Sequence, residues 1–278
     1  MKVRGERECR ECGARWSYYE TGAIECPVCE SVRSVGVDER TAHTDAHAPL
    51  DLSAHRARFG EARELPSRED FDGLKTDLRA YIRKRGFING GELLSLDDTY
   101  LGARELLEAV DCYERLRDPT DLDREYLFDL LAGADVGDRP AAADVPESLR
   151  EARGMAAVRS VDEYRSDLLA FLDELAESVK EHGEPGESAG VEGRDGSADE
   201  ERTVSVGGDA AGARIRPARE ILELIRDRTK RVEALNGDVS PEDADGLVGA
   251  ANDVGMYVRT GSESDLQRAR RRLPDEGT

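Results

Sequence analysis

Two cysteine pairs near the N-terminus constrain the fold of this chain more than any other feature. They are Cys9 with Cys12 and, after a spacer of 13 residues, Cys26 with Cys29. Each C-x-x-C can form a tight turn, or knuckle, that points two thiolates at one ion. Two knuckles supply the four sulfurs of a tetrahedral site, so we expect these four cysteines to bind one zinc ion. Because every ligand is cysteine, the site is closed, and its metal is structural: it supplies folding free energy to a segment too short to bury a core.

Three other uses of the cysteines remain open at this stage. Two disulfides would need an oxidising compartment, and a thiol-redox pair is possible for any single C-x-x-C. The second pair in register favours metal over redox chemistry. Iron is the sharper rival, but the rubredoxin site needs a longer, aromatic-rich insert between its knuckles, so zinc is favoured.

The residues around the cysteines predict a small β-rich unit over residues 1–40. The spacer suits a β-hairpin, in which residues 14–19 are strand-like and Thr21 and Gly22 can turn. Gly13 follows the first knuckle, where a left-handed backbone is often needed, and Pro27 fixes φ inside the second.

The composition is strongly acidic. The 278 residues carry a net charge of −21, and only five of the 40 basic residues are lysine. Such an arginine-rich, lysine-poor surface is typical of proteins from salt-accumulating halophiles, because concentrated salt screens the self-repulsion. The overall field does not attract nucleic acid, although concentrated salt weakens that objection. No signal peptide and no apolar run of membrane-spanning length is found, so we expect a cytoplasmic protein that does not contact a membrane.

The rest of the chain predicts helices, because apolar residues recur there at helical spacing. The predicted helices run from Ser67 to Gly86, from about Asp97 to Arg117, from Asp121 to about Ala134, from Ser160 to about Lys180, from about Ala218 to Leu235, from Ser240 to about Gly261 and from Ser262 to Leu273. Ser160 to Glu163 forms a capping box, and Ser240 is an N-cap with Pro241 behind it. Pro146 marks the start of a further short helix.

These patterns divide the chain into five segments. A zinc ribbon over 1–40 and a linker over 41–65 precede an all-α domain over 66–182. Residues 183–213 are rich in glycine and acids, and cannot bury enough apolar surface to offset their ordering entropy, so we predict a disordered linker. A helical segment over 214–278 can pack alone or dock onto the middle domain. The predicted fold class is α+β and multidomain, with a small β zinc ribbon followed by mostly α-helical parts.

Other residues with reactive side chains favour structural roles. His43 and His47 are four residues apart, but their segment has no helical stripe, which favours solvated loop histidines. His55 and His182 are isolated, and no role is assigned to them. Cys112 lies in an apolar helix and is expected to be a small buried hydrophobe.

The aromatic and basic residues offer weaker signals of recognition. Trp16, Tyr18 and Tyr19 can stack on bases, but in so small a ribbon they more readily cover the hairpin and the knuckles. The basic runs at 226–231 and 268–272 lie among acids and favour solvated helix faces with internal ion pairs. The first 38 residues carry only −1 of the charge, so the ribbon surface around Arg15, Trp16 and Tyr18 is the candidate recognition surface.

The two knuckles, C-R-E-C-G at 9–13 and C-P-V-C at 26–29, resemble those of the zinc-ribbon superfamily, including the ribbon of transcription factor B. The run over residues 4–38 resembles an uncharacterised haloarchaeal zinc-ribbon family. The resemblance departs from the common pattern at Glu30, where glycine is frequent. It implies a setting in transcription or other nucleic-acid machinery, which is an analogy from a fold with many roles.

We therefore expect a non-enzymatic interaction protein with one structural zinc, whose ribbon docks on a protein partner such as the transcription machinery. Two alternatives remain open. The ribbon can bind DNA or RNA directly, or an unrecognised enzyme site can lie among the helices. No phosphate-binding glycine loop, nucleophile elbow or metalloprotease motif supports the second alternative.

Overall fold

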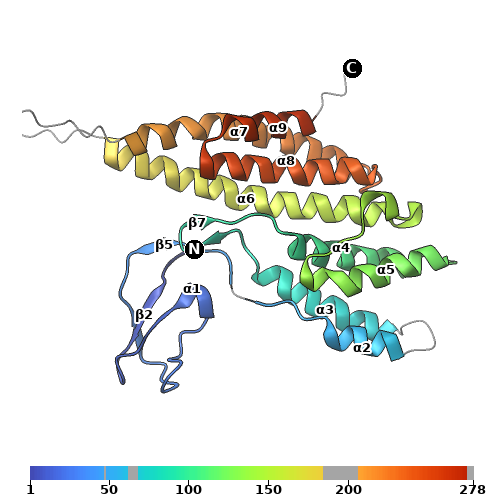
Figure 1. Ribbon diagram of the computed structural model, residues 1–278, viewed down its shortest axis with the longest axis horizontal. Coiled ribbons are helices and arrows are strands. Elements are labelled where there is room, and N and C mark those ends of the chain that lie inside the picture. Colours follow the sequence, from blue (N-terminus) through green and yellow to red (C-terminus); the bar gives the residue numbers. More distant parts are fainter. Residues whose placement is uncertain (47, 62–67, 184–205, 274–278) are drawn as a thin grey trace, which may run out of the picture.

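The computed structural model describes residues 1–46, 48–61, 68–183 and 206–273. Figure 1 shows a small β region at the N-terminus, in blue, beside a body of stacked helices. This arrangement confirms the predicted α+β fold class.

The ribbon is built from two small sheets. The strands are β1 (Lys2–Arg4), β2 (Glu6–Cys9), β3 (Arg15–Ser17), β4 (Ser34–Gly36) and β5 (Arg40–Ala42). β2 lies between β3 and β4 and is antiparallel to both, while β1 pairs with β5. The first and last strands of the ribbon, β1 and β5, therefore pair with each other and close its base.

The prediction of a hairpin within the spacer is wrong. The hairpin is formed by β2 and β3, which enclose the first knuckle. Tyr18 and Tyr19 lie in a short helix, α1 (Tyr18–Thr21), and not in a strand. The chain has to reverse at each knuckle, so the strands flanking Cys9 and Cys12 pair with each other.

Helices form the body of the molecule. They are α2 (Ser53–Glu61), α3 (Arg68–Lys84), α4 (Asp98–Tyr113), α5 (Asp121–Gly133), α6 (Arg150–Gly183), α7 (Val206–Ala234), α8 (Pro241–Thr260) and α9 (Glu263–Arg272). A hairpin of β6 (Ile88–Asn89) and β7 (Glu92–Leu93) and the short 3-10 helices η1 (Ala134–Val136), η2 (Ala142–Asp144) and η3 (Glu147–Leu149) connect them. The expected N-cap at Ser240 is present, since its side chain accepts a hydrogen bond from the Asp243 N–H at 3.0 Å.

The prediction that a helix starts at Ser160 is wrong. α6 spans 34 residues from Arg150 and passes through Ser160, which is fully buried. Gly154 does not end the helix, because it serves a close approach: a Cβ at this position would lie 2.1 Å from the carbonyl oxygen of Gly237. The capping-box pattern is thus overridden by the packing of α6 against the turn that follows α7.

α6 is the central helix of the body. It packs against α4 on one side and against α7 and α8 on the other (Figure 1). Buried residues from α3 to α9 belong to one hydrophobic core, in which the Phe87 ring meets Tyr100 at 5.1 Å and Tyr164 at 4.9 Å. The C-terminal helices therefore dock onto the middle helices, the second of the two arrangements left open by the sequence.

Both predicted linkers differ from the structure where residues are described. Residues 41–65 contain the end of β5 and all of α2, and the Thr44 N–H donates to the Ile88 carbonyl at 2.8 Å. Within the predicted linker over 183–213, residues 184–205 lie outside the described residues. α7 already begins at Val206, ahead of the expected boundary at 214.

The base of the ribbon is attached to the helical body. Within the ribbon, the Tyr19 hydroxyl links the two base strands, since it donates to the Val3 carbonyl at 3.2 Å and shares a 2.5 Å hydrogen bond with the Thr41 hydroxyl. Lys2 forms an ion pair with Glu174 of α6 at 2.8 Å. These contacts hold the base in place, while the opposite end of the ribbon extends away from the helices (Figure 1).

Candidate metal centre

The four cysteine sulfurs gather at one point, at the end of the ribbon remote from the helices. The Sγ atoms of Cys9, Cys12, Cys26 and Cys29 all lie within 4.8 Å of one another. Two of the separations, Cys9 to Cys29 and Cys12 to Cys26, are 3.6 Å. A tetrahedral ion with metal–sulfur bonds of about 2.3 Å requires sulfur separations of about 3.8 Å. The donor set therefore fits one tetrahedral metal ion, as predicted.

The two knuckles share one backbone design. In the first, the Glu11 N–H donates to the Cys9 sulfur at 3.4 Å, and in the second the Val28 N–H donates to the Cys26 sulfur at 3.4 Å. The N–H four residues after each leading cysteine, at Gly13 and Glu30, donates to that cysteine's carbonyl at 3.0 and 2.9 Å. This repetition places each pair of sulfurs at the same side of its turn.

Both knuckles need a left-handed residue at the end of the turn. Gly13 has φ of 73° and Glu30 has φ of 59°. Glycine adopts this conformation without penalty, whereas a residue with a Cβ does not. The glutamate in place of the common glycine leaves the turn geometry intact but adds strain to the second knuckle.

The electrostatics of the sulfurs favour a bound cation. Hydrogen bonding from the backbone N–H of Cys12 lowers the pKa of Cys9 to about 7. The backbone N–H of Ser31 favours the Cys29 thiolate, but the neighbouring sulfurs outweigh it and raise the pKa of Cys29 to about 12. Four thiolates repel one another, so a cation is required before all four can ionise together.

The aromatic residues of the ribbon pack within the protein. Trp16 is buried, and its indole N–H donates to the Ala23 carbonyl at 2.9 Å. Tyr18 and Tyr19 lie against the His43 ring, with centroid separations of 5.8 and 4.9 Å. Trp16 therefore packs against Cys9 and Cys26 inside the ribbon, which confirms the favoured expectation that it covers the knuckles. It is too buried to belong to the candidate recognition surface around Arg15, Trp16 and Tyr18.

His43 also differs from its prediction. It is buried and not solvated, because the Tyr18 and Tyr19 rings cover it and its Nδ1 accepts a 3.4 Å hydrogen bond from the Gly90 N–H. Burial lowers its pKa. His47 lies outside the described residues. The two histidines of this segment are thus not shown to form a metal site, and His43 packs where the ribbon meets the body.

The ribbon exposes apolar side chains near the second knuckle. Ile24, Val28 and Val32 are 53%, 72% and 64% exposed. Residues 24–26 and 31–34 run side by side, since the Cys26 N–H donates to the Ser31 carbonyl at 2.9 Å. We call Ile24, Val28 and Val32 the knuckle patch. Sequence reasoning missed it, because exposure of these residues depends on the turn.

The remaining candidates behave as predicted. Cys112 is buried on α4, and burial raises its pKa. The basic runs near the C-terminus carry ion pairs, including Arg226 with Glu223 at 2.7 Å and Arg268 with Asp253 at 3.1 Å.

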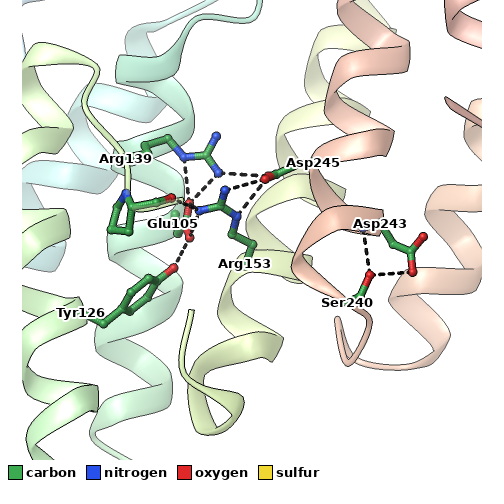
Figure 2. A network of polar contacts seen from close by, with 8 residues as sticks. Glu105, Tyr126, Arg139, Arg153, Ser240, Asp243 and Asp245 are labelled. Atoms are coloured by element: carbon green, nitrogen blue, oxygen red, sulfur yellow. Dashed lines mark hydrogen bonds and ion pairs between the residues drawn. The ribbon is translucent and has the colours of Figure 1, made fainter. Parts of the chain in front are cut away.

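Sequence reasoning also missed a series of ion pairs that join buried charged residues of α4 to residues of α6. Arg104 pairs with Glu163, Glu105 with Arg153 and Glu108 with Arg159. Glu105 is fully buried, and Figure 2 shows its carboxylate between Arg139, Arg153 and Tyr126. The signal in the sequence was the presence of Arg104, Glu105 and Glu108 inside an otherwise apolar helix.

The fold and the site define a helical protein with a four-cysteine ribbon at its N-terminus. The chain belongs to a family of unknown function, DUF7117, whose family model matches residues 1–188 and 208–273. The match thus includes both the ribbon and the helical body. No curated protein and no solved structure matches the chain. Among the helices in the described part of the chain, none combines the length and apolar composition needed to cross a membrane.

Proposed function

We propose that this protein is a non-enzymatic interaction protein, in which one structural zinc ion shapes the ribbon for contact with a protein partner. Tetrahedral four-sulfur sites are typical of zinc or of iron, and the short spacer favours zinc. All four ligands are cysteine, so no position is left for a substrate. Thiolates in this pattern persist in the reducing cytoplasm, where we place the protein.

The knuckle patch is the observation that carries the proposal. Three apolar side chains stand exposed beside the metal site, at the end of a ribbon whose base is attached to the body. Exposed apolar groups on so small a unit are typical of protein contact sites. The patch contains no aromatic residue, and Trp16 is buried, so base stacking is less favoured than protein contact.

The setting follows from the sequence. The net charge of −21 and the scarcity of lysine support a salt-accumulating cell, and the knuckles resemble those of transcription factor B. We therefore place the partner in the transcription machinery of a haloarchaeon. This part of the proposal rests on resemblance and is tested by the identity of the partner.

Affinity purification from the source organism at its own salt concentration tests both parts. The bait is the full chain with a C-terminal tag, compared with a Val28→Ser, Val32→Ser double variant and with Cys26→Ser. Val136→Ser is the matched control, because Val136 is 76% exposed but lies on the helical body. We expect a partner that is retained by Val136→Ser and lost by the other two variants.

Two outcomes would contradict the proposal. If the double variant retains every partner while it still binds zinc, the knuckle patch is not the contact surface. If nuclease treatment removes all partners, nucleic acid and not protein is recognised. A partner lost as expected but unrelated to transcription keeps the interaction role and rejects the proposed setting.

A further inference from the structure

A pocket in the helical body lies far in sequence from the metal ligands. Its volume is about 420 Å³, and it opens between the start of α4, residues 137–142, α6 and α8. The charged and polar residues that line it are Asp98, Asp138, Arg139, Arg153, Asp245 and Asn252. Pockets of this size accommodate small organic molecules.

The base of the pocket is a network of ion pairs around two buried residues, Glu105 and Arg153. Arg153 is 4% exposed and donates through Nη1 to Glu105 at 3.0 Å and to the Pro140 carbonyl at 3.0 Å. Its Nε and Nη2 donate to Asp245 at 3.0 and 2.6 Å. Tyr126 donates its hydroxyl proton to Glu105, and burial raises the pKa of Tyr126, so the hydroxyl stays a donor. Each of the three nitrogen atoms of the Arg153 guanidinium therefore donates to at least one partner.

Arg139 is hydrogen-bonded along one edge of its guanidinium, and its Nη2 also lies 3.7 Å from Oδ1 of Asp245. Its Nε and Nη2 both donate to Oε2 of Glu105, at 2.9 and 2.6 Å. The third nitrogen, Nη1, then has to point away from Glu105, as Figure 2 shows. Because Glu105 is itself held by Tyr126 and Arg153, the orientation of the Arg139 guanidinium is set in advance, which lowers the entropic cost of binding an anion.

Two carboxylates complete the charge pattern of the pocket. Glu105 and Asp245 balance Arg139 and Arg153, so the network itself is neutral. Asp98 and Asp138 are exposed, and neither forms an ion pair within the described part of the chain. The pocket thus offers a positioned cationic hydrogen-bond donor, Arg139, beside two carboxylates whose charge is not balanced by a neighbouring cation.

We propose that this pocket binds a small amino acid with a basic side chain. Its carboxylate would accept hydrogen bonds from Arg139, and its ammonium groups would meet Asp98 and Asp138. Leu101 and Val248, which also line the pocket, would contact its aliphatic part. This inference is independent of the ribbon and of its partner, since no residue of the ribbon takes part.

Calorimetric titration of the full chain with L-lysine tests the proposal, in the salt in which circular dichroism shows the chain to be folded. The matched ligand is 1,5-diaminopentane, which is lysine without its carboxylate, and hexanoate supplies the carboxylate alone. Loss of a charge-assisted hydrogen bond costs about tenfold or more in affinity, so we expect the diamine to bind about tenfold more weakly than lysine. Hexanoate should bind more weakly still.

Three variants test which residues contact each group of the ligand. Arg139→Gln should weaken lysine binding about tenfold and leave diamine binding nearly unchanged, because the diamine has no carboxylate to lose. Asp98→Asn should weaken both ligands, while Asp129→Asn, an exposed aspartate of α5 outside the pocket, should change neither. If Arg139→Gln fails to fold, the comparison of lysine with the diamine on the unmodified chain still tests whether the pocket recognises the carboxylate.

Three results would overturn the proposal. The first is the absence of lysine binding at about 10 mM, a concentration far above a physiological dissociation constant. The second is equal affinity for lysine and the diamine. The third is an equal loss of affinity in Asp98→Asn and Asp129→Asn. Any of them would leave the ion network as a purely structural link between α4, α6 and α8.

Discussion

The strained turn at Glu30 makes Glu30→Gly a direct test of how the second knuckle is held. A residue with a Cβ in the left-handed region costs about 1–2 kcal/mol, while glycine loses about 0.5–1 kcal/mol through its freedom in the unfolded chain. The difference predicts that Glu30→Gly, at φ of 59°, stabilises the ribbon by about 0.5–1 kcal/mol. Because metal binding and folding are coupled in a ribbon this small, zinc affinity should rise about two- to fivefold.

Two variants separate backbone strain from charge. Glu30→Gln removes the negative charge near the thiolates but keeps the strain, so its zinc affinity should stay near that of the unmodified chain. Gly13→Ala introduces the strain at the equivalent place in the first knuckle, where a Cβ would meet no atom within 4 Å. With no steric clash, its expected loss of about two- to fivefold in affinity reports the backbone alone.

Competition against a chromogenic zinc chelator at constant pH measures these affinities, with circular dichroism as a check that the helices stay folded. Equal gains in Glu30→Gly and Glu30→Gln would show that charge, not strain, limits binding. If neither Glu30→Gly nor Gly13→Ala changes the affinity, the reasoning from backbone conformation is refuted.

Three further predictions concern the ligands, a buried histidine and helix packing. Cys26→Ser should abolish binding of the single zinc ion measured by elemental analysis, whereas Cys112→Ser, a change on α4, should retain it; metal loss from the second variant would count against the site. Burial lowers the pKa of His43, so its neutral form contributes stability above its ordinary pKa of about 6.5, and this contribution is lost as the pH falls below it. Denaturant unfolding between about pH 4 and 7 should show a shallower pH dependence for His43→Gln, and an unchanged slope would contradict this assignment. Gly154→Ala should destabilise the chain by about 1–3 kcal/mol, because its Cβ would clash with a backbone carbonyl. Gly246→Ala on α8 should stabilise the chain by about 0.5–1 kcal/mol, because the added Cβ would lie 3.7 Å from its nearest neighbour. Thermal unfolding of the two variants checks the opposite signs.

The sequence was sufficient to predict the four cysteines whose sulfurs gather within 4.8 Å of one another, because the geometry of each pair is local. In each pair the two cysteines lie within one turn, so the spacing alone indicates that both sulfurs can point to one side. The same holds for the N-cap at Ser240, whose hydrogen bond to the Asp243 N–H spans three residues. Features set by a few neighbouring residues are the ones that sequence patterns can predict.

The boundary at Ser160 failed because a local signal competed with a long-range one. Its capping box is a valid helix start, but the chain is already helical from Arg150, and Ser160 is buried by neighbouring helices. Gly154 lies in the same helix, and its contact with the Gly237 carbonyl on a distant turn is a second long-range feature. The identity of that neighbour cannot be read from the residues around Gly154.

The ion pairs of α4 also depend on long-range contacts that the local sequence does not predict. Glu105 lies in an apolar helix, and a buried carboxylate has to find cations, so the need for partners was visible in the sequence. Which cations meet it depends on how α6 crosses α4 and on the path of the loop that carries Arg139. The packing that supplies Arg139 and Arg153 to Glu105 also forms the walls of the proposed amino-acid pocket. A candidate ligand site of this kind can therefore be found only once the helices are assembled, whereas the candidate metal site can be predicted from the spacing of four cysteines.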